Sequence, residues 1–288
     1  MGEGKKWLHS YQAHASAFGG RLQHPIELHL PVLASTSLPV VGGYDSARHE
    51  NFRHHDAFSI QAAYTHVGGG FDRETGSWKT VASSVVEGLN VNNVLFADRI
   101  VAQISVDHGT DSYHPKVSFD GTLFEGLRIG KCEVKPVLKL ALCDDAPQGK
   151  FPARSCLKND KFVAFAHQQS RKFAEFWLKQ KGPDGKPLRG MEHLDKDGVN
   201  AKDEVEQRGS VLCSLVESIE GKCAGTKFGH AIHVPDFGRI FLGELAVDHG
   251  AFHLTMVRLD LGSPMTGLVM AAQAAAGGPH GSGSGTTT

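Results

Sequence analysis

The sequence predicts a mainly β protein, built as an antiparallel β-sandwich, a barrel or stacked sheets, with one inserted helix. Apolar residues recur at every second position in several segments, as they do along a strand with one buried face. Short glycine-rich segments such as VGGYD, ETGS and FDGT separate these runs and are typical of turns. Many short strands joined by such turns favour packed antiparallel sheets.

The clearest alternation lies in KCEVKPVLKLAL, residues 131–142, where every even-numbered position is apolar. Pro136 cannot donate a ladder hydrogen bond, which favours an edge strand or a bulge. Residues 94–106 and 58–64 alternate in the same way. Further expected strands span residues 26–32, 78–86, 116–119, 211–219, 239–247 and 252–261. The last is apolar on both parities, which we interpret as a strand covered on both faces.

One segment has helical spacing instead. Its apolar stripe is Phe162, Ala166, Gln169, Phe173, Phe176 and Trp177. Asn159 or Asp160 would cap its start and Gly182 would follow its end. The predicted organisation is an N-terminal arm (1–20), one β-rich domain (21–275) and a glycine- and serine-rich tail (276–288). A helix-plus-loop insertion (157–208) separates two expected pseudo-repeat halves, 21–145 and 209–275.

The tetrapeptide VDHG occurs at residues 106–109 and again at 247–250. Each copy follows Arg-Ile and a run of strand-like residues. Asp can hydrogen-bond the backbone of its own turn and Gly supplies positive φ, so we interpret both copies as turns that leave a strand.

Composition narrows the function. Lys plus Arg (30) nearly equals Asp plus Glu (31), which predicts no binding to nucleic acid. No apolar run reaches the roughly 18 residues of a membrane-spanning helix. No secretory leader is visible, so a cytoplasmic location is the default expectation, with non-classical export open. Five cysteines without a CxxC pair favour reduced, structural thiols, and Cys213 with Cys223 would be the pair to bridge after export.

Histidine is unusually frequent, at 17 of 288 residues. The densest group is His230, His233, His249 and His253, with Asp248 beside them. Neutral imidazole and carboxylate are ligands for Zn²⁺, so this group is the candidate site for a divalent metal. The sequence indicates no catalytic residue, because it contains no nucleophile motif, no phosphate-binding loop motif and no zinc-protease motif.

Four stretches carry a resemblance: SLPVVGGYDSAR, SSVVEGLNVNNVLFADRIVAQIS, PKVSFDGTLFEGLRI and IHVPDFGRIFLGEL with LTMVRLDLGSP. They resemble an uncharacterised bacterial family of β-rich hypothetical proteins. More distantly, the Gly-Leu-x-Val strands are similar to surface proteins of the choice-of-anchor type. The resemblance implies no catalytic residues.

Three functions follow as hypotheses. The first is a non-catalytic structural or binding protein that self-assembles, as a homo-oligomer or a filament, through exposed strand edges. The second is a metal-binding protein or metal-dependent enzyme that uses the histidines of residues 230–253. The third is a small-ligand or glycan-binding β module in which Trp78 or Tyr64 stacks on the ligand.

Overall fold

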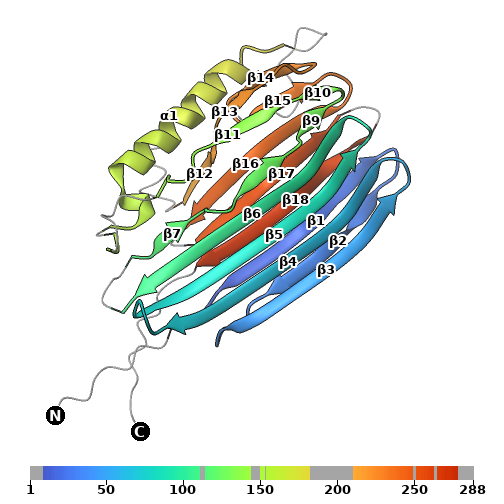
Figure 1. Ribbon diagram of the computed structural model, residues 1–288. Coiled ribbons are helices and arrows are strands. Elements are labelled where there is room, and N and C mark those ends of the chain that lie inside the picture. The colour runs from blue at the N-terminus through green and yellow to red at the C-terminus, as the bar shows by residue number, and fades with distance from the viewer. Residues whose placement is uncertain are drawn as a thin grey trace, which may run out of the picture.

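A computed structural model describes residues 9–110, 114–143, 150–152, 154–181, 210–248, 251–262 and 265–277. Two eight-stranded antiparallel sheets, which we call sheet A and sheet B, pack face to face (Figure 1). Within the described residues, the single α-helix lies beside them. The predicted fold class is confirmed, in the form of stacked sheets. The expected loop of residues 182–208 and most of the expected tail lie outside the described residues.

Sheet A combines the two ends of the chain. Its order is β14 (Thr226–Phe228), β15 (Ala231–Val234), β16 (Gly238–Asp248), β17 (Ala251–Leu261), β18 (Thr266–Gly277), β1 (Ala13–His24) and β2 (Leu28–Ser37), with β12 (Ser210–Ser214) also paired to β16. β1 begins inside the segment expected to be an N-terminal arm. β18 pairs with both β17 and β1, which places the C-terminal strand in the middle of the sheet.

Sheet B holds most of the strands expected from alternation. Its order is β10 (Cys132–Glu133), β9 (Arg128–Ile129), β6 (Leu95–Gly109), β5 (Ser77–Val91), β4 (Phe58–Asp72) and β3 (Gly43–His54), with β7 (Lys116–Ser118) and β8 (Leu123–Glu125) paired to β6. The expected strand 131–142 is divided between β10 and β11 (Lys135–Leu138). β11 leaves sheet B and pairs with β13 (Val216–Glu220) in a small third sheet.

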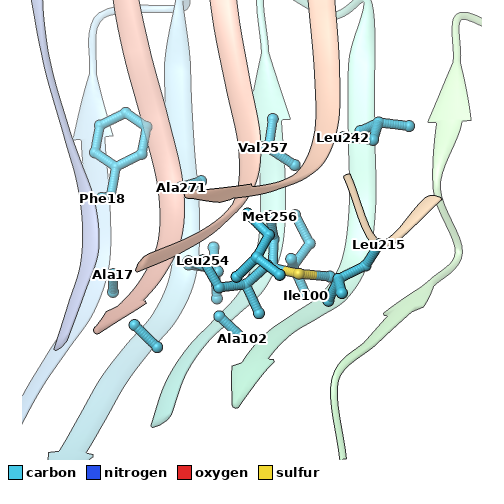
Figure 2. Close-up of a cluster of buried hydrophobic side chains, with 14 of the residues drawn as sticks. Ala17, Phe18, Ile100, Ala102, Leu215, Leu242, Leu254, Met256, Val257 and Ala271 are labelled. Carbon is cyan, nitrogen blue, oxygen red and sulfur yellow. The ribbon is translucent and has the colours of Figure 1, made fainter. Parts of the chain in front are cut away.

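A row of kinked residues crosses sheet A. It consists of Ala34, Ala17, Ala272, Met256 and Gly243, which face one another across five neighbouring strands. Three of them have positive φ: 46° at Ala34, 52° at Ala272 and 61° at Gly243. We call this set the kink row of sheet A. At the row each strand turns two consecutive residues toward the core, as Met256 and Val257 do (Figure 2).

The kink row explains why β17 is apolar on both parities. Its buried residues are Phe252, Leu254 and Met256 before the row and Val257, Leu259 and Leu261 after it. The strand therefore keeps one face toward the core throughout and changes parity at Met256–Val257. The expectation that both faces of this strand are covered along its length is wrong.

Sheet B has a kink row of its own, whose side chains point the opposite way from those of the row in sheet A. Asn51, Gln61, Gly88 and Asp98 face one another across β3 to β6, and Asn51 and Gly88 have positive φ. Here two consecutive side chains point away from the core, as Asp98 and Arg99 of β6 do. Asn and Gly suit these positions because they tolerate left-handed backbone better than other residues.

Buried hydroxyls bind carbonyl oxygens at the kink row of sheet A. Thr65 Oγ1 donates to Ala34 O at 3.0 Å, and Ser84 Oγ donates to Ser16 O at 2.9 Å. Ser214 Oγ donates to Leu242 O at 2.8 Å. A buried carbonyl without a partner would cost about 1–3 kcal/mol. The polar residues inside this sandwich thus satisfy the backbone where the kinks interrupt the strand ladder.

Helix α1 (Asp160–Trp177) confirms the helical segment. The Asn159 side chain accepts hydrogen bonds from the backbone amides of Lys161 and Phe162, as the predicted N-cap requires. Phe162, Ala166, Phe173 and Trp177 of the expected stripe are buried. The Gln169 side chain bonds the backbone of Ser214 and Val216, which fixes the helix to the segment joining β12 to β13. No helix in the described part of the chain is long and apolar enough to span a bilayer.

The first VDHG copy is the end of a strand, and the turn interpretation is wrong for it. Asp107, His108 and Gly109 are the last residues of β6 and pair with Lys79, Trp78 and Ser77. Burial raises the pKa of Asp107, against the lowering effect of Lys79 and Lys116. In the second copy Val247 and Asp248 end β16, while His249 and Gly250 lie outside the described residues.

The cysteines differ from the expected reduced set. Cys143 and Cys156 form a disulfide that ties the segment after β11 to the start of the helical region. Cys132, Cys213 and Cys223 are free thiols. Cys213 lies buried in β12, and burial raises its pKa to about 12. Cys213 is therefore not bridged to Cys223.

Candidate functional site

Helix α1 covers part of the outer face of sheet A and leaves the rest of that face open. Phe173, Phe176 and Trp177 pack against Phe228 and Phe241, on the outer side of β14 and β16. The outer side of β17, β18, β1 and β2 carries exposed residues instead. We call this second region the open face. The boundary between the covered and open regions runs along β16 and β17.

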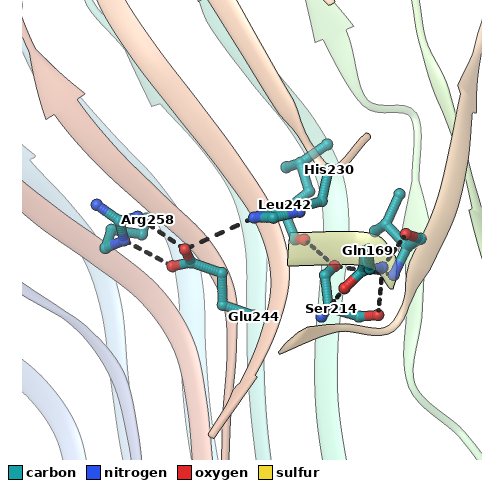
Figure 3. A network of polar contacts seen from close by, with 7 residues as sticks. Gln169, Ser214, His230, Leu242, Glu244 and Arg258 are labelled. Atoms are coloured by element: carbon teal, nitrogen blue, oxygen red, sulfur yellow. Dashed lines mark hydrogen bonds and ion pairs between the residues drawn. The ribbon is translucent and has the colours of Figure 1, made fainter. Parts of the chain in front are cut away.

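A buried charged cluster occupies this boundary. Arg258 on β17 donates two hydrogen bonds to the Glu244 carboxylate on β16, with Nε–Oε2 at 2.6 Å and Nη2–Oε1 at 2.7 Å (Figure 3). The Arg258 guanidinium carbon also lies 3.7 Å from the centre of the Phe241 ring. His230, in the turn before β15, places Nε2 at 3.9 Å from Glu244 Oε1. Phe173 of α1 stacks on the His230 ring, with centroids 4.6 Å apart.

The strand register explains how the cluster forms. Phe241 and Arg258 are directly opposite each other, and Glu244 is opposite Thr255. All lie on the outer side of sheet A, where neighbouring side chains of one face are within contact distance. His230 joins them because its carbonyl accepts a hydrogen bond from Leu242 N, next to Phe241.

Electrostatics assign fixed charges to this cluster. Burial lowers the pKa of Arg258, but its hydrogen bonds and charge attraction to Glu244 outweigh burial and raise the pKa overall. The pKa of His230 is lowered to about 4, chiefly by burial; the Glu244 carboxylate acts to raise it and Arg258 acts to lower it. The short distance to Glu244 does not make His230 charged near neutral pH, because Arg258 already neutralises that carboxylate. His230 therefore acts as a neutral aromatic ring between Phe173 and the ion pair.

The chemical capacity of the cluster follows from these contacts. A neutral imidazole beside a carboxylate could act as a base only for a group that reaches it. The hydroxyl of Ser214, drawn in the same view, donates to the Leu242 carbonyl and is thereby engaged (Figure 3). The cluster holds Arg258 in place at the border of the open face, which is a positioning role rather than a catalytic one.

The structure separates the predicted metal ligands into two pairs. His230 lies opposite Leu242, and His233 pairs with Arg239, both toward the start of β16. Asp248 ends β16, six residues after Leu242, which corresponds to about 20 Å along a strand. His253 of β17 is exposed and diagonal to Asp248 across the hairpin. His249 lies outside the described residues.

Within those described residues, no three His, Cys, Asp or Glu side chains are grouped so that they could hold a metal ion. His230 and His233 are thus kept apart from Asp248 and His253 by the length of β16. Asp248 and His253 share one exposed end of the sheet.

The aromatic residues considered for glycan stacking are engaged within the protein. The Trp78 ring stacks on His9 with centroids 5.2 Å apart and also contacts Phe71. The Tyr64 hydroxyl donates to Glu87 at 2.9 Å on the outer side of sheet B. The stacking face of Trp78 is occupied by His9, so this alternative gains no support from the arrangement.

Glu244 and Arg258 were not singled out from the sequence. The available signal was a charged residue within an otherwise apolar strand, as in IFLGELAV and LTMVRLDL. A charge that is buried in this way requires a partner, which predicts that two such strands are neighbours.

The fold and the cluster define a β-sandwich protein with an ion pair on its outer side, at the border of the region that helix α1 covers. The chain belongs to the family described as Domain of unknown function (DUF8256), whose model matches residues 9–248. This confirms membership of an uncharacterised family. No curated protein and no solved structure matches the chain. β17 and β18 lie beyond the matched residues although they occupy the centre of sheet A.

Proposed function

We propose that the protein is a non-catalytic structural or binding protein that associates with a second copy of itself through the open face. The observation that carries the proposal is a group of exposed apolar side chains on this side of sheet A. Val32 is 62% exposed and Leu268 is 39% exposed. Exposed apolar groups that share one surface are typical of interaction sites.

The register brings these side chains together. Met270 pairs with Gly19, and a Cβ built on Gly19 would lie 3.4 Å from Val32 Cγ2. The Val32 side chain therefore lies next to Gly19, on the side of β1 opposite to Met270. Leu268 lies two residues from Met270 on the same side of β18. The result is an apolar strip across β2, β1 and β18 that ends at Arg258, which pairs with Met270.

Charges beside the strip suit a second copy of the chain. Arg21, opposite Leu268, forms an ion pair with Glu27. Asp260, also opposite Leu268, forms an ion pair with Arg239. Both signs thus occur beside the apolar strip. A symmetric dimer places each patch against itself, which requires such a mixture rather than one sign.

The strand edges favour contact through the face over the edge-to-edge assembly considered from the sequence. Edge strand β2 contains Pro31 and the positive-φ residue Ala34. Edge strand β3 contains the kinked Asn51 together with charged and exposed residues such as Arg48 and Glu50. Proline, kinks and charge on an edge all oppose the addition of another strand. We therefore expect closed dimers and not filaments.

The experiment is sedimentation velocity on the untagged full chain over a range of concentrations. Leu268→Asp and Val32→Asp each place a carboxylate on the strip and should weaken dimerisation by at least about tenfold. Val41→Asp is the matched control, because Val41 is 89% exposed in the turn between β2 and β3. A wild-type chain that stays monomeric, or an equal effect of the control, would overturn the proposal. Filaments in negative-stain electron microscopy would restore the edge hypothesis.

A divalent metal is the second candidate function, at the exposed end of the β16–β17 hairpin. Asp248 and His253 lie on the same side there, diagonal to each other across the β16–β17 pair. Carboxylate and imidazole together suit Zn²⁺. Metal analysis of untagged protein should give close to one equivalent, reduced in His253→Ala. A content below about a tenth of an equivalent would exclude this candidate.

We also propose that the protein works outside the cytoplasm, at a bacterial surface. The Cys143–Cys156 disulfide supports an oxidising environment, where such bonds persist. Fractionation of cells that produce the native chain, with detection by antibody, tests it. Recovery solely in the cytoplasmic fraction would contradict it.

A further inference from the structure

We propose that oxidation joins Cys132 and Cys223, which are free thiols in this structure, in a second disulfide that links the β10 end of sheet B to the segment that follows β13. Nothing in the proposed dimer depends on this bond. The two residues are 91 positions apart in the sequence, so only the fold relates them.

The first observation is the strand register. β11 pairs with β13 so that Lys135 faces Glu220 and Pro136 faces Ile219. The same antiparallel register, continued past these residues, brings Cys132 opposite Cys223. Opposite residues in antiparallel strands have Cα atoms about 4.5–5.5 Å apart. That separation falls within the range of about 4.4–6.8 Å that a disulfide spans.

The second observation shows that the close approach does continue. A Cβ built on Gly221 would lie 2.4 Å from Glu133 O and 3.4 Å from Val134 Cα. The segment after β13 thus passes directly against the backbone between β10 and β11. Gly221 has φ of +86° and carries no side chain, and both properties permit this contact.

The third observation is electrostatic. Burial raises the pKa of Cys223, Lys227 lowers it, and the neighbouring Cys132 raises it again. The two sulfurs are therefore close enough to repel each other as thiolates. The Lys227 ammonium is held nearby by hydrogen bonds to the carbonyls of Ile219 and Gly221.

The remaining cysteines complete the pairing. Cys143 and Cys156 are already joined, and Cys213 is buried in β12 with a strongly raised pKa. A buried thiol of this kind is inert. Five cysteines then divide into two pairs and one unreactive core residue, which accounts for the odd number.

Glutathione disulfide can supply the oxidising equivalents. The thiolate of Cys132 or Cys223 attacks one sulfur of glutathione disulfide and releases one glutathione thiolate. The other cysteine, as its thiolate, then attacks the protein sulfur of the mixed disulfide and releases the second glutathione. Two cysteine thiols are oxidised by two electrons, and one glutathione disulfide is reduced to two thiols that take up the two protons.

The test is peptide mapping of the native full chain after equilibration in a glutathione redox buffer. Free thiols are blocked before trypsin digestion under non-reducing conditions. Cleavage at lysine should release residues 132–139 linked to residues 223–227, because Pro136 prevents cleavage after Lys135. Cys213→Ser is the control and should keep this link. In Cys132→Ser, the thiol of Cys223 should react with maleimide.

A stability measurement gives an independent readout. With the Cys143–Cys156 bond intact in both proteins before and after treatment, oxidation should move the urea midpoint of the wild-type chain upward and should leave the midpoint of Cys223→Ser unchanged. Recovery of the two peptides unlinked, in a sample where Cys143 and Cys156 are linked, would overturn the proposal. A link from either residue to Cys213 would overturn it as well.

Discussion

The buried His230 predicts an acid sensitivity that one substitution removes. An unfolded histidine has a pKa of about 6.5, whereas burial lowers the pKa of His230 to about 4. The folded chain therefore favours the neutral ring. Its contribution to stability is complete above the unfolded pKa and declines as the pH falls from about 6.5 toward 4, because the unfolded state binds the proton first.

The size of the effect follows from the two pKa values. A difference of about 2.5 pKa units corresponds to roughly 3 kcal/mol once the pH lies below both values. Between pH 7 and pH 5 this single group should remove about 2 kcal/mol from the free energy of unfolding. The groups that face the ring are Glu244, Arg258 and Phe173, and the mutual bonds of Glu244 and Arg258 remain whether or not His230 is present.

The variant is His230→Phe, which keeps an aromatic ring against Phe173 and removes the titration. Urea unfolding at pH 7 and pH 5, followed by the fluorescence of the buried Trp177, gives the free energy at each pH. The variant should lose about 2 kcal/mol less than the wild type over this interval. Other carboxylates and histidines contribute equally to both proteins, so they cancel in the comparison.

The control is His253→Phe, since His253 is exposed on β17. It should keep the pH dependence of the wild type. An equal loss in wild type and His230→Phe would refute the reasoning, because it would show that the ring is not held neutral by burial.

Two further predictions concern the kink rows. Gly88→Ala should lower the free energy of unfolding in urea by about 1–2 kcal/mol, because Gly88 has φ of +63° and the new Cβ would lie 2.7 Å from Gln61 Cβ. The control is Gly70→Ala, where nothing lies within 4 Å of the new Cβ, and it should change this free energy by less than about 0.5 kcal/mol. Equal losses in the two variants would contradict the role of the row. Thr65→Val should lower the free energy of unfolding by about 1–3 kcal/mol in the same assay, because the Ala34 carbonyl loses its hydrogen-bond donor. Thr80 is buried on the same side of sheet B, and Thr80→Val should lower the free energy of unfolding by less.

Alternation of apolar residues predicted most of sheet B and much of sheet A. β4, β5 and β6 each expose one side to solvent and the other to the core, so the period of two is visible in the sequence. The helix was also predictable, because its buried stripe and its cap at Asn159 are both local signals.

β18 could not be predicted in the same way. Its sequence, TGLVMAAQAAAG, is rich in alanine, which has low strand propensity. It forms a strand because β1 and β17 pair with it on both sides, and its small side chains fit between the two sheets. That stabilisation comes from residues more than 200 positions away in the case of β1, so no local pattern contains it.

The candidate site was predictable only in part. His230 drew attention because histidines are frequent near it, but its environment depends on Phe173 and Arg258 from distant elements. The separation of His230 from Asp248 depends on the length and direction of β16. The positions of the histidines in the sequence therefore predicted neither the distances between their side chains in the fold nor their charge.

The kink row of sheet A also constrains how the chain could have changed during evolution. A strand that turns two consecutive residues inward contains one residue fewer than a regular strand with the same number of inward-facing residues, as β17 shows between Phe252 and Leu261. Insertion of one residue between Ala271 and Ala272 of β18 alone would restore regular alternation there and would leave Ala17 and Met256 without a matching neighbour. An insertion or deletion at this level would have to occur in several strands together, so the row couples segments that lie far apart in the sequence.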